Sequence, residues 1–90
     1  MFYLETLNLK NFNTSLASEI NYLFFGCISL TSLNLNNFNT SLVVNMREIF
    51  CYCYSLETLI ITNFNTSLVE DMDSMFLNCN SFKVIKFKIF

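Results

Sequence analysis

One pentapeptide, Asn-Phe-Asn-Thr-Ser, recurs along this chain at a constant spacing of 26 residues, and this repeat constrains the fold more than any other feature. Its three copies occupy residues 11–15, 37–41 and 63–67. Aligned on these copies, the chain divides into units 1–26, 27–52 and 53–78 and a partial unit 79–90. A catalytic loop is needed only once, so the repeat indicates a structural pentapeptide within a stack of equivalent units.

The first part of each unit reads Leu-x-x-Leu-x-Leu or a close variant of it. In chain order, its apolar positions are Leu4, Leu7, Leu9; Leu30, Leu33, Leu35; Leu56, Leu59, Ile61; and Phe82, Ile85, Phe87. Apolar residues that alternate with period two predict a short strand with one buried face. We therefore expect a parallel sheet with its strands in chain order, as in a leucine-rich repeat.

The second part of each unit follows a different period. From Val43 to Phe50 the apolar residues lie at i, i+3, i+6 and i+7, which predicts one apolar stripe of a helix. The predicted helices lie near 15–24, 41–50 and 67–76. Since no unit buries its apolar side alone, the expected fold is one α/β repeat domain over residues 1–90. It is a leucine-rich-repeat solenoid of about 3.5 coils, a fragment of a longer array, with a concave parallel sheet and short convex helices.

The pentapeptide is expected to form the corner between strand and helix. Its phenylalanines should point inward and stack as a structural spine, formed by Phe12, Phe38 and Phe64. Thr40, Asn39 or Ser41 is suited to cap the helix that follows, because its side-chain oxygen accepts from free backbone amides. Asparagine side chains can also bond the backbone of neighbouring coils, where water does not reach the polar groups.

Composition excludes several classes of function. The chain has no histidine, no proline and one glycine, so the usual base for a serine or cysteine nucleophile and a glycine-rich phosphate loop are both missing. A net charge of −2 argues against nucleic acid as a partner. Asn, Ser and Thr interrupt every uncharged stretch, and the N-terminus lacks the pattern of a signal peptide. We therefore expect a protein without enzymatic activity, cofactor, metal or membrane insertion.

The repeat resembles a known family. The strings MFLNCNSF at 75–82 and CISLTSLNLNNFNTSLVVNMREIF at 27–50 are similar to the BspA-like leucine-rich repeat surface proteins. That family repeats roughly M-F-x-x-C-x-S-L-x-x-L-x-L-x-x-F-x-T-S-x-V-x-x-M. The resemblance implies a parallel-sheet solenoid, display at the cell surface or secretion, and protein binding or adhesion without catalytic residues. The chain departs from the pattern in its corner asparagines and in leucines at the first helix position, which are Leu16, Leu42 and Leu68.

Three cysteines fall in one column of the aligned units: Cys27, Cys53 and Cys79. We expect a ladder of buried free thiols that pack as small apolar groups. Adjacent rungs are close enough for a disulfide, but side chains that point in parallel give poor geometry for one. Cys51 and Cys53 together with Cys27 are an alternative metal site, which neither a Cys-x-x-Cys motif nor a histidine supports.

Asn13, Asn39 and Asn65 each begin an Asn-Thr-Ser sequence, which matches a glycosylation acceptor. The alternative is that these residues are structural and match the motif because the corner repeats. We favour the structural interpretation.

The outward positions of the predicted strands form the candidate binding face. Its residues are Glu5, Asn8, Thr31, Asn34, Glu57, Ile60, Lys83 and Lys86. The functional interpretation is a mixed polar patch that contacts a protein partner, and the alternative is a solvated face without a ligand. Four strands give an area of a few hundred Å², below the ~800 Å² per partner of a standard interface. We therefore expect weak binding by this face alone.

The runner-up function is a structural fragment that self-associates end to end. Solenoids need polar terminal units, and this chain has apolar columns at both ends. Lysines 83, 86 and 88 place positive charge at the C-terminal strand and oppose pairing between two C-terminal ends. We therefore expect head-to-tail association, which does not close and grows into filaments.

Overall fold

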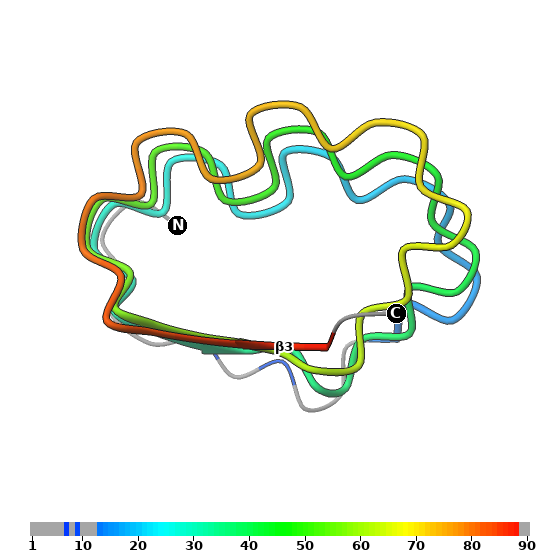
Figure 1. Cartoon of the computed structure of the whole chain (residues 1–90), viewed down its shortest axis with the longest axis horizontal. Coiled ribbons are helices and arrows are strands. Elements are labelled where there is room, and N and C mark those ends of the chain that lie inside the picture. The colour runs from blue at the N-terminus through cyan, green and yellow to red at the C-terminus, as the bar shows by residue number, and fades with distance from the viewer. Residues whose placement is uncertain (1–6, 8, 10–12, 89–90) are drawn as a thin grey trace.

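A computed structural model describes residues 7, 9 and 13–88 of the chain. Its strands are β1 (Ser32–Asn34), β2 (Thr58–Ile61) and β3 (Val84–Phe87). They form one parallel sheet in the order β1-β2-β3, and equivalent residues of successive units are paired, so Leu33 lies beside Leu59 and Leu59 beside Ile85 (Figure 1). The predicted parallel sheet in chain order is confirmed.

The two faces of the sheet differ in the way that the alternating sequence predicts. Leu33 is buried between exposed Ser32 and Asn34, and Leu59 and Ile61 are the buried residues of β2. β1 and β2 therefore bury every second side chain, as expected for a sheet with one face against the core, whereas all four residues of β3 are exposed.

Figure 1 shows the chain winding repeatedly around one elongated path, with each turn lying over the one before. We call these turns layer 1 (residues 13–26), layer 2 (residues 27–52) and layer 3 (residues 53–78). The side of the stack that carries β1, β2 and β3 is the sheet side, and the opposite side is the turn side. The core fills the space between them, and its largest fully buried side chains are Phe24, Phe50, Leu30, Leu33, Leu35, Met46, Ile49, Leu56 and Leu59.

The turn side contains no helix within residues 13–88, so the predicted helices near 15–24, 41–50 and 67–76 are wrong. Consecutive β-turns take their place. The Leu23 amide donates to the Ile20 carbonyl at 3.3 Å, and the Cys27 amide donates to the Phe24 carbonyl at 3.2 Å. The third residue of the second turn, Gly26, has a φ of 72°, as a type II turn requires.

On the turn side, every second backbone amide donates a hydrogen bond to a carbonyl of the next layer and not to a carbonyl of its own layer. The Ile20, Tyr22 and Phe24 amides donate to the carbonyls 25 residues further along, at 2.9–3.0 Å. In layer 2 the same ladder starts from the amides of Met46, Glu48, Phe50 and Tyr52. An amide cannot serve both a helix and this ladder, so the stacked layers exclude the helix. The apolar spacing of three and four residues misled the prediction, because a row of four-residue turns also places every third and fourth side chain inward.

The pentapeptide corner is held by its threonine rather than by a helix cap. Thr40 is 1% exposed, and its Oγ1 accepts from the Asn65 amide at 2.8 Å and donates to the Asn65 carbonyl at 3.1 Å. Thr14 makes the same pair of bonds to Asn39, at 2.9 and 3.2 Å. Each threonine therefore satisfies both backbone groups of one asparagine in the next layer. The predicted cap is wrong because no helix follows it.

Phe38 and Phe64 of the predicted spine are buried, and Phe12 lies outside the described residues. The rings that stack in parallel belong to another column. Phe24 and Phe50 have ring centroids 5.9 Å apart with an interplanar angle of 4°, and Phe50 and Phe76 are 5.5 Å apart at 10°. Phe24, Phe50 and Phe76 occupy equivalent positions in layers 1, 2 and 3, so their stacked rings join the three layers.

Candidate interaction surface

The outer face of the sheet brings the predicted binding residues of three units side by side. Thr31, Glu57 and Lys83 form the first row, in which the Glu57 amide donates to Thr31 and the Lys83 amide donates to Glu57, both at 2.8 Å. The Lys83 ammonium lies 3.2 Å from a Glu57 carboxylate oxygen. Backbone hydrogen bonds therefore hold the three residues of this row side by side, and the side chains of Glu57 and Lys83 form an ion pair.

A second row follows from the strand register. Asn34 pairs with Ile60 and Ile60 with Lys86, so a polar, an apolar and a basic side chain lie next to each other. Asn34 and Lys86 are exposed and Ile60 is half-buried. The predicted members Glu5 and Asn8 lie outside the described residues.

Beyond the strands, side chains continue the polar face in an ordered way. Thr62 Oγ1 donates to Asn36 Oδ1 at 2.6 Å, and Asn63 Nδ2 donates to the Asn36 carbonyl at 2.6 Å. These bonds join equivalent corners of layers 2 and 3. The side chains at this edge are consequently held in place before any partner arrives.

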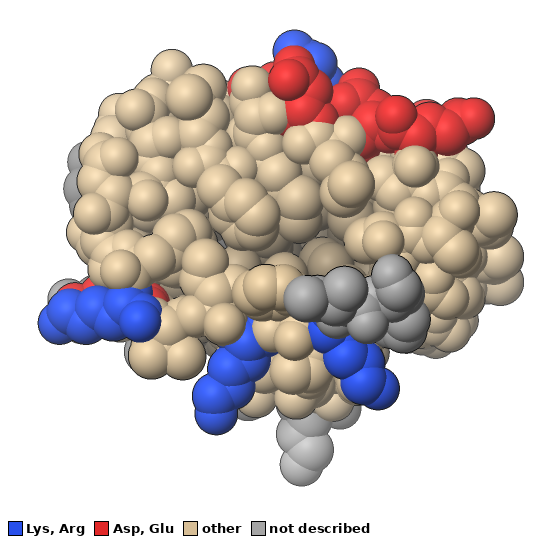
Figure 2. Space-filling view, viewed as in Figure 1, with Lys and Arg blue, Asp and Glu red and all other residues tan. Residues whose placement is uncertain are grey.

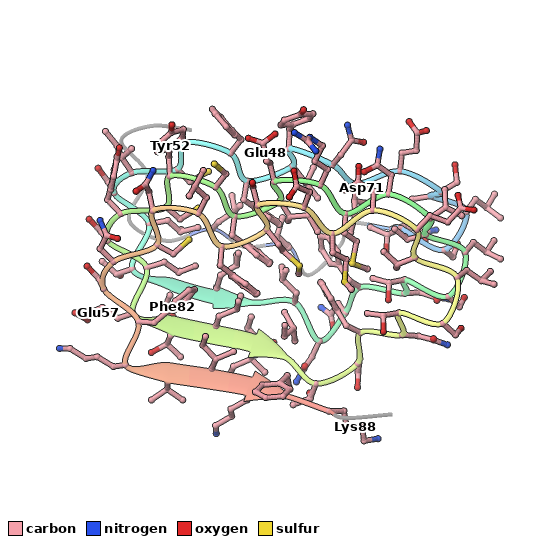
Figure 3. The ribbon with its side chains drawn as sticks, turned by 45° about the horizontal axis from the view of Figure 1, so that its top comes forward. Glu48, Tyr52, Glu57, Asp71, Phe82 and Lys88 are labelled. Carbon is pink, nitrogen blue, oxygen red and sulfur yellow. The ribbon has the colours of Figure 1, made fainter. Side chains whose placement is uncertain are left out.

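A charged cluster on the turn side was missed by the sequence analysis. Arg47 Nη1 lies 2.7 Å from Asp73 Oδ2 and 4.0 Å from Asp71 Oδ2, and its Nε lies 3.2 Å from Glu48 Oε2. A hydrogen bond with the Tyr22 side chain, together with the neighbouring carboxylates, raises the pKa of Arg47 above its ordinary value. Figure 3 labels Glu48 and Asp71 on this side of the molecule. The aligned units could have revealed this cluster, because Arg47 occupies the same position in its unit as Asp73 does in the next unit.

The cysteine column lies inside the stack. Cys27 and Cys53 are buried, Cys79 is half-buried, and all three are free thiols. The Cys53 thiol donates to the Phe24 carbonyl at 3.1 Å, and the Cys79 thiol donates to the Phe50 carbonyl at 2.8 Å. A hydrogen bond with Cys79, followed by burial, raises the pKa of Cys53, and burial raises the pKa of Cys27. The thiols of Cys27 and Cys53 therefore stay protonated at neutral pH and are poor nucleophiles.

Cys51, the cysteine outside the column, is also buried and free. Burial, followed by the neighbouring Glu48, raises its pKa. Across the described part of the chain, no group of three His, Cys, Asp or Glu side chains has a geometry that could hold a metal ion.

The three asparagines of the Asn-Thr-Ser sequences each use their side chain locally. Asn13 Oδ1 accepts from the Ser15 amide at 2.9 Å, and Asn39 and Asn65 accept from the amides of Ser41 and Ser67 at 3.0 Å. Such Asx turns tighten a corner. All three side chains therefore have a structural role.

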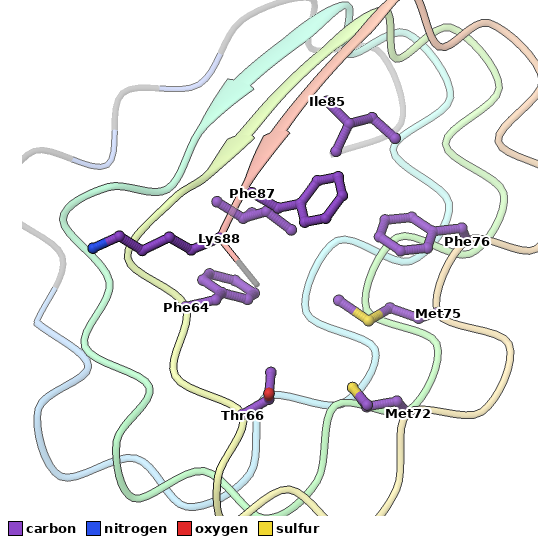
Figure 4. Close-up of a pocket in the computed structure, with 9 residues that line it drawn as sticks. Phe64, Thr66, Met72, Met75, Phe76, Ile85, Phe87 and Lys88 are labelled. Carbon is purple, nitrogen blue, oxygen red and sulfur yellow. The ribbon is translucent and has the colours of Figure 1, made fainter. Parts of the chain in front are cut away.

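An apolar pocket of about 280 Å³ opens where layer 3 meets β3 (Figure 4). Its lining residues are Ile61, Phe64, Thr66, Met72, Met75, Phe76, Ile85, Phe87 and Lys88. Met72 and Phe76 are 49% and 39% exposed, although the equivalent residues of layer 2 are fully buried. The pocket is therefore an uncovered part of the core.

Within the described residues, the structure contains no helix that is long and apolar enough to cross a membrane. Neither the curated proteins nor the solved structures include a significant match to the sequence. One family model, described as "Mycoplasma protein of unknown function, DUF285", matches residues 1–88. A match over nearly the whole length shows that the chain belongs to this family.

Proposed function

We propose that the chain is a leucine-rich-repeat solenoid module of the BspA-like type, without enzymatic activity, that binds a protein partner through the outer face of its sheet. One observation carries this proposal. Three units with the same pattern place different side chains at equivalent outward positions, in the rows Thr31-Glu57-Lys83 and Asn34-Ile60-Lys86. The repeat keeps the interior constant and varies the surface, as a binding scaffold does.

The order of this face supports a binding role. Backbone groups of the strands are bonded to the neighbouring strands, and Glu57 and Lys83 are joined by an ion pair. A partner therefore meets side chains that are already positioned, so less conformational entropy is lost on binding. The central Ile60 supplies apolar area, and Lys86 supplies charge that no carboxylate within 4 Å neutralises among the described residues.

The residue types that usually carry catalysis support an enzymatic function less well than a binding function. The sequence has no histidine, and the buried thiols of Cys27, Cys51 and Cys53 have raised pKa values. The hydrogen bond with Cys53 lowers the pKa of Cys79, but this thiol is half-buried and donates to the Phe50 carbonyl at 2.8 Å. Nucleophilic catalysis needs an ionised or base-activated group that the substrate can reach. These facts favour recognition over catalysis.

The small size of the face sets the expected strength of binding. Strands about 4.8 Å apart give an area of a few hundred Å² per partner, which is typical of weak and transient contacts. Display of many copies on a surface would raise the effective affinity through multivalency. Location at the cell surface is proposed on the BspA-like resemblance.

The experiment uses the chain displayed as a tetramer on streptavidin against a panel of purified extracellular proteins, measured by biolayer interferometry. A protein that binds is then tested with the Ile60→Arg variant, which changes the centre of the face. We expect binding to fall about tenfold or more, because central residues carry most of the energy of an interface.

The matched control is Leu42→Arg, a substitution of a 47% exposed leucine on a corner away from the face. It should leave binding unchanged. Equal losses in the two variants, or no binding by any protein at ~100 μM of the tetramer, would show that the face is not a binding site.

A further inference from the structure

The sheet side and the turn side end at different levels at the C-terminal end. On the sheet side, β3 adds a strand beyond β2. On the turn side, the row of paired residues Glu19, Asn45 and Asp71 stops in layer 3, before β3 begins. Within the described residues the end is therefore a step, with β3 raised and the turn side of layer 3 uncovered. The apolar pocket lies at the foot of this step (Figure 4).

Core residues are exposed at this step and not at the opposite turn-side end. Met72 is 49% exposed and Phe76 39%, whereas their equivalents in layer 1, Ile20 and Phe24, are 6% and 2% exposed. On β3, Phe87 is 59% exposed. An apolar surface of this kind normally marks a contact with another molecule.

Backbone donors are also uncovered at the step. Four amides of layer 2 bond to layer 3, and their equivalents in layer 3 are those of Met72, Ser74, Phe76 and Asn78. None of these four has a hydrogen-bond acceptor among the residues that the structure describes. An occupant of the step must therefore bring carbonyl groups as well as apolar side chains.

Charge divides the same end into two halves. Figure 2 shows acidic side chains gathered along one edge and lysines along the opposite edge. The acidic residues of layer 3 on the turn side are Glu70, Asp71 and Asp73, and the lysines near β3 are Lys83, Lys86 and Lys88. A partner with a basic edge over the acids and an acidic edge over the lysines would match both halves.

We propose that the occupant is a second copy of this chain, bound end against end about a two-fold axis parallel to the strands. This rotation exchanges the sheet side and the turn side. The raised β3 of each copy then enters the recess above layer 3 of the other, and the lysines of each copy face the acids of the other. Edge carbonyls of β3 meet the free amide row, and the two pockets join into one apolar core.

This arrangement differs from the head-to-tail filament expected from the sequence. A two-fold pair is closed, because both copies use the same surface and this surface is then occupied in each of them. The lysines do not oppose it, since they face acids and not each other. A two-fold axis perpendicular to the strands would place Lys86 against Lys86 and leave both recesses unfilled.

The size of the end is sufficient for a pair. Principal extents of 30 × 27 Å across the layers give an end of roughly 600 Å² per copy before side chains are added, near the ~800 Å² of a standard interface. This is larger than the outer face of the sheet, so pairing should be the stronger of the two contacts.

The first measurement is the mass of the 90-residue chain by light scattering across a concentration series. We expect a plateau at twice the chain mass of 10.5 kDa. A mass of one chain at high micromolar concentration overturns the proposal, and so does a mass that keeps rising without a plateau.

The second measurement tests the axis with two variants of opposite charge. Lys86→Glu with Lys88→Glu makes the end acidic. Glu70→Lys with Asp71→Asn makes it less acidic and more basic, and an asparagine is tolerated because Asn45 already accepts from the amide two residues on, as Asp71 does. Each variant alone should dissociate about tenfold or more readily than the parent chain, and an equal mixture should regain the two-chain mass.

Two controls complete the design. Glu19→Lys makes a comparable charge change at the position equivalent to Asp71 in layer 1, so it should leave the mass unchanged. Phe87→Asp should abolish pairing, while Leu16→Asp, at a leucine that is 88% exposed, should not. Circular dichroism confirms that each variant is folded. Charge variants that pair as well alone as in the mixture would overturn the two-fold arrangement.

Discussion

At the scale of single residues, the interior is organised by small polar groups that bridge successive layers. Thr14 and Thr40 are buried, yet the hydroxyl of each both donates to and accepts from the backbone of one asparagine in the next layer. A buried polar group is tolerated only when it is paired in this way. The pentapeptide therefore recurs because its threonine and the asparagine of the next unit form one contact.

Replacing Thr40 with valine should cost roughly 2–3 kcal/mol of unfolding free energy, because the backbone groups of Asn65 lose their partner in a buried place. Urea denaturation provides the measurement. Thr66→Val is the matched control, since Thr66 is exposed and equivalent in sequence, and it should cost less than about 0.5 kcal/mol. Similar losses for both would contradict the bridging role.

The buried Cys53 thiol should make stability depend on alkaline pH. Its pKa in the folded chain is raised above the ordinary value of 9.0 by the hydrogen bond with Cys79 and by burial. Below pH 9 the thiol is protonated in both states, so it contributes no slope. Above pH 9 the unfolded chain loses this proton first, so the free energy of unfolding falls as the pH rises.

The measurement is urea denaturation between pH 7.5 and 10. Both proteins carry Cys79→Ala, because the hydrogen bond with Cys53 lowers the pKa of Cys79, so replacing Cys53 would otherwise change the titration of Cys79 as well. In this background burial still raises the Cys53 pKa, so Cys53→Ala should show the shallower decline, and the difference removes the contribution of the other titratable groups. Parallel declines in the two proteins would mean that the Cys53 pKa is not raised on folding.

At the scale of elements, the turn side is a row of β-turns with positive φ at equivalent places. Tyr22, Glu48 and Ser74 have φ values of 53–63°. This region is unfavourable for residues with a Cβ atom, and glycine occupies it readily. Among the described residues, glycine occupies one of six such positions, Gly26, so the ladder between layers imposes the conformation on the others.

Ser74→Gly should therefore stabilise the protein by about 0.5–1 kcal/mol, because the left-handed conformation becomes less costly. Ser55→Gly is the matched control at a half-buried serine whose φ is not positive, and it should destabilise by a similar amount. Thermal melting of both variants is sufficient. Destabilisation by Ser74→Gly would show that the turn is not strained.

At the scale of the whole molecule, each layer depends on its neighbours. Layer 2 contacts a layer on each side, and its core residues are buried, whereas Met72 and Phe76 on the turn side of layer 3 are not covered by any residue that the structure describes. In such arrays stability is approximately a sum of contacts between neighbours. We therefore expect local unfolding to be less frequent in layer 2 than in layer 3.

Hydrogen exchange should reveal this gradient along the ladder. Amides of Met46, Glu48 and Phe50 are bonded to layer 3 and should exchange slowly, while those of Met72, Ser74 and Phe76 should exchange quickly. The measurement is made at a concentration where the mass in solution is 10.5 kDa, one chain. Equal protection of the two rows in the single chain would contradict the open end.

Sequence reasoning was accurate where the repeat itself carries the information. The sheet and its register follow from the alignment of Leu33, Leu59 and Ile85, because similar units in contact place their equivalent residues side by side. It failed on the turn side, because an apolar stripe is common to a helix and to a row of turns, and the competing backbone ladder is invisible in one sequence. The Arg47 cluster was in principle visible, since its partner Asp73 follows 26 residues later.

The ladder of the turn side also gives the stack an electrical direction. The amides that donate to the next layer are those of Ile20, Tyr22, Phe24 and Gly26 in layer 1 and of Met46, Glu48, Phe50 and Tyr52 in layer 2. The peptide dipoles of these bonds are therefore aligned along the stack. By analogy with a helix, aligned peptides leave partial positive charge where the N–H groups are free and partial negative charge at the other end. The amides of layer 3 that have no acceptor among the described residues are then a positive pole, and the carboxylates of Asp71 and Asp73, which also pair with Arg47, lie beside it as counter-charges.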